Sequence, residues 1–166
     1  MSWVVDLRER LATPPPRRLP PPETRRAAVL VPLYVDAGEL WVLLTTRADG
    51  LPHHRSQIAF PGGSIELGED AWQAAARETE EELGIAPPLL LELGRLDEVD
   101  TPTGFHVLPF VAAVPHPVPT RPNPAEIAEV FPLPLTALAN PQLIEEREVL
   151  IDGRSHAIVV FHVGGR

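Results

Sequence analysis

The sequence contains no cysteine, no lysine and no long uninterrupted apolar run. The absence of cysteine excludes disulfide bonds, thiolate-bound zinc and a cysteine nucleophile, and it favours a reducing, cytoplasmic setting. Because a membrane span needs about 18 consecutive apolar residues, no spanning segment is expected. The charged N-terminus, with Asp6, Arg8 and Glu9, is not typical of a signal peptide. These observations predict a soluble cytoplasmic protein.

Negative charge is concentrated in one part of the chain. The net charge is −9, and residues 61–100 hold eleven acidic residues against Arg77 and Arg95. Every basic residue is an arginine, which we attribute to genomic base composition. Recognition of nucleic acid through its phosphates needs clustered basic and aromatic residues, so a nucleic-acid partner is not expected.

The length and composition fit one domain with a single core, since 44% of the 166 residues are hydrophobic. A short amphipathic helix is predicted at the N-terminus, with Val4, Leu7 and Leu11 on one face, followed by a proline-rich connector. We expect residues 1–24 to pack on a catalytic domain that spans residues 25–166. The alternative is a proline-rich ligand for a partner module.

Several runs rich in Val and Leu predict the strands of a sheet. Runs 27–35 and 40–46 flank the turn-like sequence Asp36-Ala37-Gly38 and predict a hairpin. Further strands are predicted at 89–99, 105–114, 147–151 and 157–163, and a short helix at 133–139. Strands and helices interleave, but hairpins dominate. We therefore expect an α/β protein of the α+β type, with a mixed β-sheet sandwiched between α-helices.

The clearest predicted helix, 70–83, carries an unusual cluster of acidic residues. It has no internal Gly or Pro and ends at Gly84, a favourable residue just after a helix. Glu78, Glu81 and Glu82 share one face, where like charges repel one another. The alternative is a solvated acidic surface. A bound cation would relieve the repulsion, and carboxylate oxygens favour Mg²⁺, with Mn²⁺ as a chemically similar substitute.

The sequence from Gly63 to Ile85 resembles the signature of the Nudix hydrolase family, G-x5-E-x7-R-E-U-x-E-E-x-G-U. Its charged and glycine positions are all matched, by Gly63, Glu69, Arg77, Glu78, Glu81, Glu82 and Gly84. Thr79 departs from the pattern, because position U usually holds a larger apolar residue. The resemblance implies attack of water on one phosphorus of a diphosphate, assisted by Mg²⁺.

The resemblance and the spacing together give roles to the residues of this segment. Gly62 and Gly63 permit a tight loop that contacts substrate and brings the carbonyl of Gly63 toward the metal. Glu69 is expected to begin the helix and to pair with Arg77, which orients the neighbouring acids. By resemblance, Glu78 and Glu82 are the principal metal ligands, and Glu81 shares a metal or orients a water. Glu80 is expected to face solvent.

A second signature upstream resembles that of the coenzyme A pyrophosphatase subfamily, L-L-T-x-R-[SA]-x3-R-x3-G-x3-F-P-G-G. The matching segments are 43–48 and 60–63, whereas Pro52 and Ser56 depart from the pattern. The segment 101–109 is also similar to one that these enzymes carry after the Nudix signature. The implied products from coenzyme A are phosphopantetheine and adenosine 3′,5′-bisphosphate. Alternative readings are hydrolysis of ADP-ribose, NADH or a dinucleoside polyphosphate, or a catalytically silent nucleotide-binding module.

Arginines and one further carboxylate complete the predicted site. Arg47 and Arg55 are the candidates for contacts to substrate phosphates. The segment 125–131 resembles the place where some Nudix enzymes carry an additional catalytic carboxylate on a mobile loop, which makes Glu129 or Glu126 a candidate base.

The remaining expectations concern residues and segments outside the catalytic set. His53 and His54 are read as loop residues, because no zinc-ligand spacing is present. Trp41 and Trp72 are read as packing residues. The resemblance also implies a homodimer and a C-terminal helix beyond the last predicted strand, before which this sequence ends.

Overall fold

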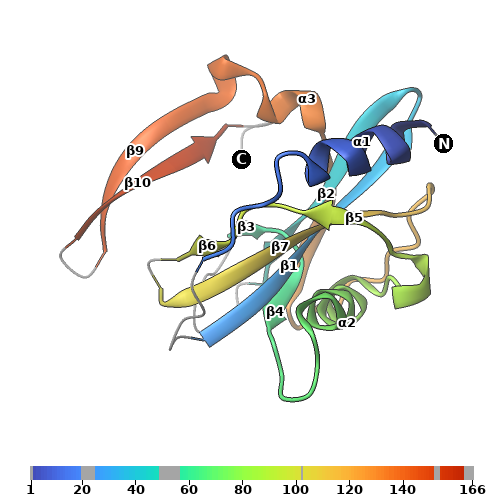
Figure 1. Cartoon of the computed structure of the whole chain (residues 1–166), viewed down its shortest axis with the longest axis horizontal. Coiled ribbons are helices and arrows are strands. Elements are labelled where there is room, and N and C mark those ends of the chain that lie inside the picture. Colours follow the sequence, from blue (N-terminus) through green and yellow to red (C-terminus); the bar gives the residue numbers. More distant parts are fainter. Residues whose placement is uncertain (1, 20–24, 49–56, 102, 152–153, 163–166) are drawn as a thin grey trace.

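A mixed β-sheet lies between helices in the computed structural model, which describes residues 2–19, 25–48, 57–101, 103–151 and 154–162 (Figure 1). The strands are β1 (Arg25–Asp36), β2 (Glu39–Arg47), β3 (Ile58–Ala59), β4 (Gly62–Ser64), β5 (Leu91–Arg95), β6 (Val99–Asp100), β7 (Phe105–Ala113), β8 (Ile127–Pro134), β9 (Ile144–Ile151) and β10 (Arg154–Phe161). The helices are α1 (Ser2–Ala12), α2 (Ala71–Leu83) and α3 (Leu135–Leu138), with short 3₁₀ turns at Pro87–Leu89 and Pro141–Leu143. None of these described helices is long and apolar enough to cross a membrane.

The main sheet combines antiparallel and parallel pairs. Its central order is β3-β2-β1-β7-β5, with β4 paired to β1, β6 to β7 and β8 to β2. Strand β1 is antiparallel to β2 and parallel to β7. The predicted hairpin is confirmed, and its turn places Ala37 and Gly38 at φ 47° and 82°, as a two-residue turn between twisted strands requires. The mixed sheet confirms the predicted fold class.

Alternating side chains of the sheet build an apolar cluster on each face. One cluster joins Leu30 and Phe110 to the alanines of α2. The other joins Val31 and Val111 to Val4 of α1 and to partly buried residues of α3. Helices therefore cover both faces, so the sandwich expected from the sequence is present.

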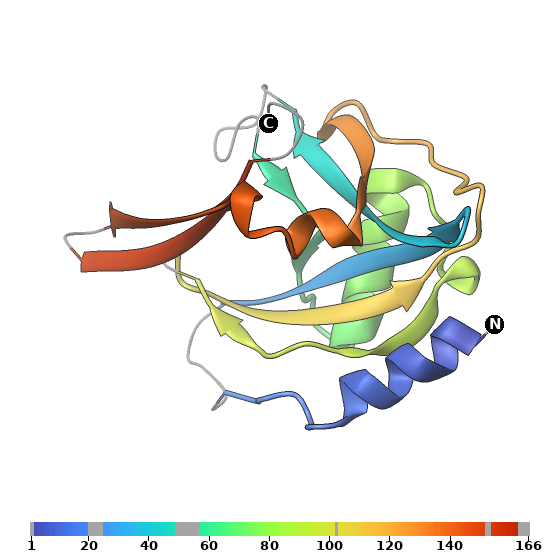
Figure 2. The ribbon, with the colours of Figure 1, turned by 90° about the horizontal axis from the view of Figure 1, so that it is seen from above.

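The N-terminal helix packs along β5, as Figure 2 shows. The helix comes so near to this strand that a Cβ at Gly94 would lie 2.8 Å from the Cβ of Leu11. The guanidinium of Arg8 donates to the carbonyl of Glu92 at 2.6 and 3.2 Å. In the connector, the amide of Leu19 donates to the carboxylate of Glu98 at 2.8 Å. The division into residues 1–24 and 25–166 stays a prediction.

Two expectations about the sequence after α2 are wrong in part. The run 89–99 is not one strand, because a 3₁₀ turn precedes β5 and the chain leaves the sheet before β6. The register of β5 against β7 also shifts between Glu92 and Gly94. Most of segment 125–131, expected as a mobile loop, belongs to β8, which pairs with β2 from Ile127 onward. Prolines within β8 are compatible with its position, since it pairs only with β2 and forms an edge.

The last two predicted strands exist but do not extend the main sheet. Strands β9 and β10 pair with each other in a separate antiparallel hairpin that projects from the body of the molecule (Figure 1). The helix predicted at 133–139 is shortened to α3, because Leu133 and Pro134 end strand β8.

Candidate active site

Local interactions fix both ends of the acidic helix α2. The side chain of Asp70 accepts from the amide of Gln73 at 2.9 Å, and the side chain of Gln73 accepts from the amide of Asp70 at 2.8 Å. This reciprocal pair is a capping box. At the other end, Gly84 adopts φ 70° and donates to the carbonyl of Glu80 at 2.8 Å. The helix therefore starts after Asp70, and the expectation that Glu69 begins it is wrong.

Thr79, the one departure from the family signature, is accommodated in the core. Its side chain is fully buried, and its hydroxyl donates to the carbonyl of Ala75 at 2.7 Å. The hydroxyl is thus satisfied within the helix, so this departure leaves no unpaired polar group.

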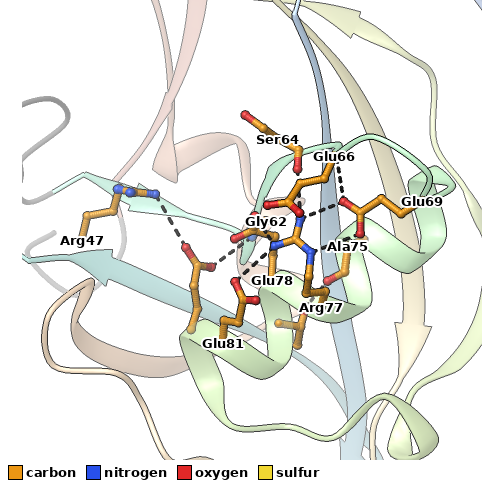
Figure 3. A network of polar contacts seen from close by, with 11 residues as sticks. Arg47, Gly62, Ser64, Glu66, Glu69, Ala75, Arg77, Glu78 and Glu81 are labelled. Carbon is orange, nitrogen blue, oxygen red and sulfur yellow. Dashed lines mark hydrogen bonds and ion pairs between the residues drawn. The ribbon is translucent and has the colours of Figure 1, made fainter.

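Arg77 ties the loop before the helix to the acidic face (Figure 3). Its Nε and Nη2 donate to the two carboxylate oxygens of Glu69 at 3.1 and 2.8 Å, and Nη2 also reaches the carbonyl of Ser64 at 3.1 Å. Its Nη1 contacts Glu78 at 2.9 Å and Glu81 at 3.2 Å. The hydrogen bonds from Arg77, together with the one from the amide of Glu66, hold the pKa of Glu69 below its ordinary value. The pairing of Arg77 with Glu69 and its contact with the neighbouring acids match the arrangement expected from the sequence.

Glu82 is the most buried of the clustered carboxylates, with 5% of its side chain exposed. It accepts from the amide of Gly62 at 3.0 Å, and Nη1 of Arg47 lies 3.7 Å from its second oxygen. The pKa of Glu82 is raised to about 7, mainly by burial and also by the charges of Glu78 and Glu126, which together outweigh these two favourable contacts. The protein thus holds Glu82 where its negative charge is disfavoured unless a cation is near.

Glu78 lies beside Glu82 and directly against the glycine loop. Its side chain is 17% exposed. Burial raises its pKa, while Arg77 opposes this rise and the charges of Glu81 and Glu126 add to it. A Cβ at position 63 would collide with the carboxylate of Glu78. Glycine at this position is therefore required for the close approach of backbone and carboxylate.

Gly62 is required for a different reason. Its φ is 156°, and a Cβ there would meet the backbone of β1, with Val29 Cα at 2.7 Å and the carbonyl oxygen of Ala28 nearer still. Strand β4 pairs with β1 at this point, so Val29 faces Gly62 and Ala28 faces Gly63. The two glycines bring the loop backbone onto the sheet and onto the acidic face of α2 together.

The chemistry of the donor set fits a hard divalent cation. Glu78 and Glu82 offer carboxylate oxygens whose charge is disfavoured by burial and by mutual repulsion. Glu81, 54% exposed, lies on the same helical face. Within the described residues, no three such side chains yet converge into a ready-made metal site, and the guanidinium of Arg77 contacts both Glu78 and Glu81. Oxygen donors of this kind suit Mg²⁺ with waters and substrate oxygens completing its shell.

The other predicted residues fall at different distances from this centre. Glu80 is exposed, as expected. Glu126, just before β8, lies near enough for its charge to raise the pKa of both Glu78 and Glu82. Glu129 is exposed on β8, opposite Thr46 of β2.

Of the two arginines predicted to contact substrate phosphates, the structure describes Arg47. Its Nε is buried without a hydrogen-bond partner among the described residues. Arg55, His53, His54, Pro52 and Ser56 lie outside the described residues. The sequence reasoning overlooked the capping pair of Asp70 and Gln73, although the pattern of a short polar residue followed three positions later by Gln was readable.

Comparisons with known proteins identify the family. The NUDIX domain family model matches residues 24–152. The uncharacterized Nudix hydrolase NudL of Yersinia pestis (strain Pestoides F) is 36% identical over 135 residues, which cover 81% of this chain and 67% of that protein. The Nudix hydrolase RenU of M. smegmatis superposes with a TM-score of 0.60 and 27% identity, covering 70% of this chain and 74% of that one. The C. elegans Ap4A hydrolase, in a binary complex, gives a TM-score of 0.57 and 27% identity over 68% of this chain and 81% of that one.

The fold and the family match define a hydrolase of diphosphate bonds. The chain belongs to the Nudix hydrolase family, as its resemblance to the family signature predicted.

Proposed function

We propose that the protein hydrolyses the diphosphate linkage of coenzyme A or a close derivative, releasing phosphopantetheine and adenosine 3′,5′-bisphosphate. The observation that carries the proposal is the meeting of two signatures in space. Arg47 comes from the segment similar to coenzyme A pyrophosphatases, and its guanidinium lies 3.7 Å from Glu82 of the Nudix helix. This closeness supports Arg47 as a contact for a substrate phosphate bound at the acidic centre.

Mg²⁺ is the proposed cofactor, since Nudix hydrolases generally use divalent metal ions. Glu78 and Glu82 would hold it, with Glu81 and the carbonyl of Gly63 as further donors. When bound, the cation supplies the positive charge that lets an anionic diphosphate approach an acidic site and that stabilises charge in the transition state.

The protein's own side chains orient the metal ligands, contact the substrate and accept a proton from the attacking water. Arg77 fixes the loop after β4 against α2, and the amide of Gly62 orients Glu82. The unpartnered Nε of Arg47 is a donor available to a phosphate oxygen. A hydrogen bond to phosphate would offset the free-energy cost of keeping this donor buried and unpaired. Glu126 and Glu129 are the candidates for accepting the proton of the attacking water. Glu126 is favoured by its charge interaction with both buried carboxylates.

Paired substitutions separate the two candidate bases. If Glu126 accepts the proton, Glu126→Gln lowers kcat about 100-fold or more and flattens the acidic side of the pH profile, whereas Glu129→Gln changes kcat little. A larger loss in Glu129→Gln than in Glu126→Gln would reverse the assignment. If both variants retained full activity, neither Glu126 nor Glu129 would be the base.

The substrate is tested with a panel of coenzyme A, ADP-ribose, NADH and a dinucleoside polyphosphate, in the presence of Mg²⁺, with products resolved by mass. We expect coenzyme A to give the largest kcat/KM. Glu82→Gln is the inactive control, and Glu80→Gln, an exposed position on the same helix, is its charge-matched partner. Preferred cleavage of another compound would keep the family chemistry and overturn the coenzyme A assignment.

A second candidate substrate class is the dinucleoside polyphosphates, favoured by the likeness to the C. elegans Ap4A hydrolase. The same helix would serve that reaction, so only the panel distinguishes the two classes. A catalytically silent nucleotide-binding module is a third reading. Binding of a panel compound without turnover, in protein with intact Glu78 and Glu82, would support it.

A further inference from the structure

A cavity of about 280 Å³ lies between α1, the connector that follows it and strand β5. Its walls are mostly apolar and include Leu11, Pro15, Leu93, Leu96, Leu108 and Pro109. None of its lining residues belongs to α2 or to the glycine loop. This cavity is therefore separate from the acidic centre.

Four arginines line the same cavity, against two glutamates. One of these acids, Glu98, is already engaged, since its carboxylate accepts from the amide of Leu19 at 2.8 Å and lies 3.1 Å from Nε2 of His106. The other, Glu92, receives Arg8 on its neutral backbone carbonyl. Bonds to neutral groups leave the charge of both acids in place, so the two glutamates offset two of the four arginine charges.

The arginines themselves make few contacts with carboxylates. Arg95 lies over the ring of Phe110 at 4.7 Å, a contact that does not neutralise its charge. Arg17 pairs with Asp97 at 3.9 Å, with both side chains well exposed, so the pair is weak. In the described part of the chain, no ion pair is formed by Arg8, Arg18 or Arg95. With Asp97 counted beside the two lining glutamates, the four arginines leave a local excess of one positive charge, on a protein whose net charge is −9.

We propose that this cavity binds a phosphomonoester with a short apolar body. The apolar walls suit the body, and guanidinium groups suit phosphate oxygens because they donate several bonds in one plane. A phosphomonoester presents three acceptor oxygens, so it can accept from more than one guanidinium at once, where a carboxylate presents two. The volume lies at the lower limit of ligand sites, which favours a small molecule. The proposal does not depend on the substrate of the acidic centre.

Calorimetric titration of the full chain with hexyl phosphate in EDTA tests the proposal. EDTA keeps the acidic centre free of cations, so that centre repels phosphate and no turnover is involved. We expect saturable binding at one site, at least about tenfold tighter than hexanol or inorganic phosphate, because neither probe satisfies both walls and arginines. Failure of this titration leaves the proposed hydrolysis unaffected, and the reverse also holds.

A matched pair of variants locates the site. Arg18→Gln removes an exposed lining arginine and is expected to weaken hexyl phosphate binding about tenfold. Arg10→Gln removes the same charge from α1 at an exposed position outside the cavity, and its affinity should equal that of the wild type. Absence of saturable binding, equal binding of hexanol or inorganic phosphate, or equal losses in the two variants would each overturn the proposal.

Discussion

Replacing Glu82 with glutamine should stabilise the metal-free fold while removing the proposed metal ligand. Burial raises the pKa of Glu82 from its ordinary 4.5 to about 7. The folded protein therefore keeps a proton on this carboxyl that the unfolded chain releases. The contribution of Glu82 to stability is complete below pH 4.5 and is lost as the pH rises through about 7. Glutamine resembles the protonated form at every pH.

The magnitude follows from the two pKa values. A rise from 4.5 to about 7 corresponds to roughly 3 kcal/mol of folding free energy, at about 1.36 kcal/mol for each pH unit. The amide oxygen of glutamine can still accept from Gly62, but the attraction to Arg47 is lost. We therefore expect Glu82→Gln to be about 2 kcal/mol more stable than the wild type near pH 8, a gain of about 4 to 8 °C in Tm. Near pH 4.5 the difference should vanish.

The assay is urea unfolding across pH in EDTA, for the wild type, Glu82→Gln and Glu80→Gln. Differences between variants at each pH remove the contributions of titrating groups that do not interact with Glu82. Glu80→Gln removes the same charge from an exposed position and should stay within about 0.5 kcal/mol of the wild type. Adding Mg²⁺ should stabilise the wild type more than Glu82→Gln. A Glu82→Gln curve that runs parallel to the wild type at all pH values would refute this reasoning.

Four further substitutions, at three parts of the site, test its surroundings. Gly63→Ala should lower kcat about tenfold or more with little loss of stability, because the added Cβ displaces only the Glu78 carboxylate. Gly62→Ala should instead lower the unfolding free energy by about 2 kcal/mol or more in urea, because its Cβ meets the backbone of β1. Arg77→Lys should reduce kcat/KM about 10- to 100-fold and weaken Mg²⁺ binding, since lysine cannot make the forked contact with Glu69; unchanged Mg²⁺ affinity would contradict this role. Thr79→Val should change the unfolding free energy by less than about 1 kcal/mol and leave activity intact, because the carbonyl of Ala75 keeps its backbone hydrogen bond in the helix. A large loss of stability or activity would show that the hydroxyl of Thr79 has a further role.

The elements with strong local signals were predictable from the sequence. The helix 70–83 was readable from its alanines and from Gly84, and the structure ends α2 at that glycine in a left-handed conformation. The hairpin at 36–38 was readable from its turn residues. The contact of Arg77 with Glu81 followed from helical spacing, because residues four apart share a face. The pairing of Arg77 with Glu69 was also expected, although Glu69 lies before α2.

The parts that depend on tertiary context were not predictable. Strand β8 contains prolines that argue against a strand, and only its place at the edge of the sheet makes them acceptable. The nearness of Arg47 to Glu82 depends on the packing of β2 against the rest of the sheet, which no local spacing encodes. The cavity beside β5 likewise requires the approach of Leu11 to Gly94, residues far apart in the chain. Secondary-structure propensity predicts single helices and strands and does not predict how they pack together.

The helix α1 can be regarded as a ligand that is covalently tethered to its own binding site. Residues held by a short connector experience an effective concentration on the order of millimolar, so even modest intrinsic affinity keeps them docked. The burial of Val4 and the bonds from Arg8 to β5 supply that affinity. Because α1 forms one wall of the cavity beside β5, cutting the connector would let this wall leave and rejoin the strand reversibly.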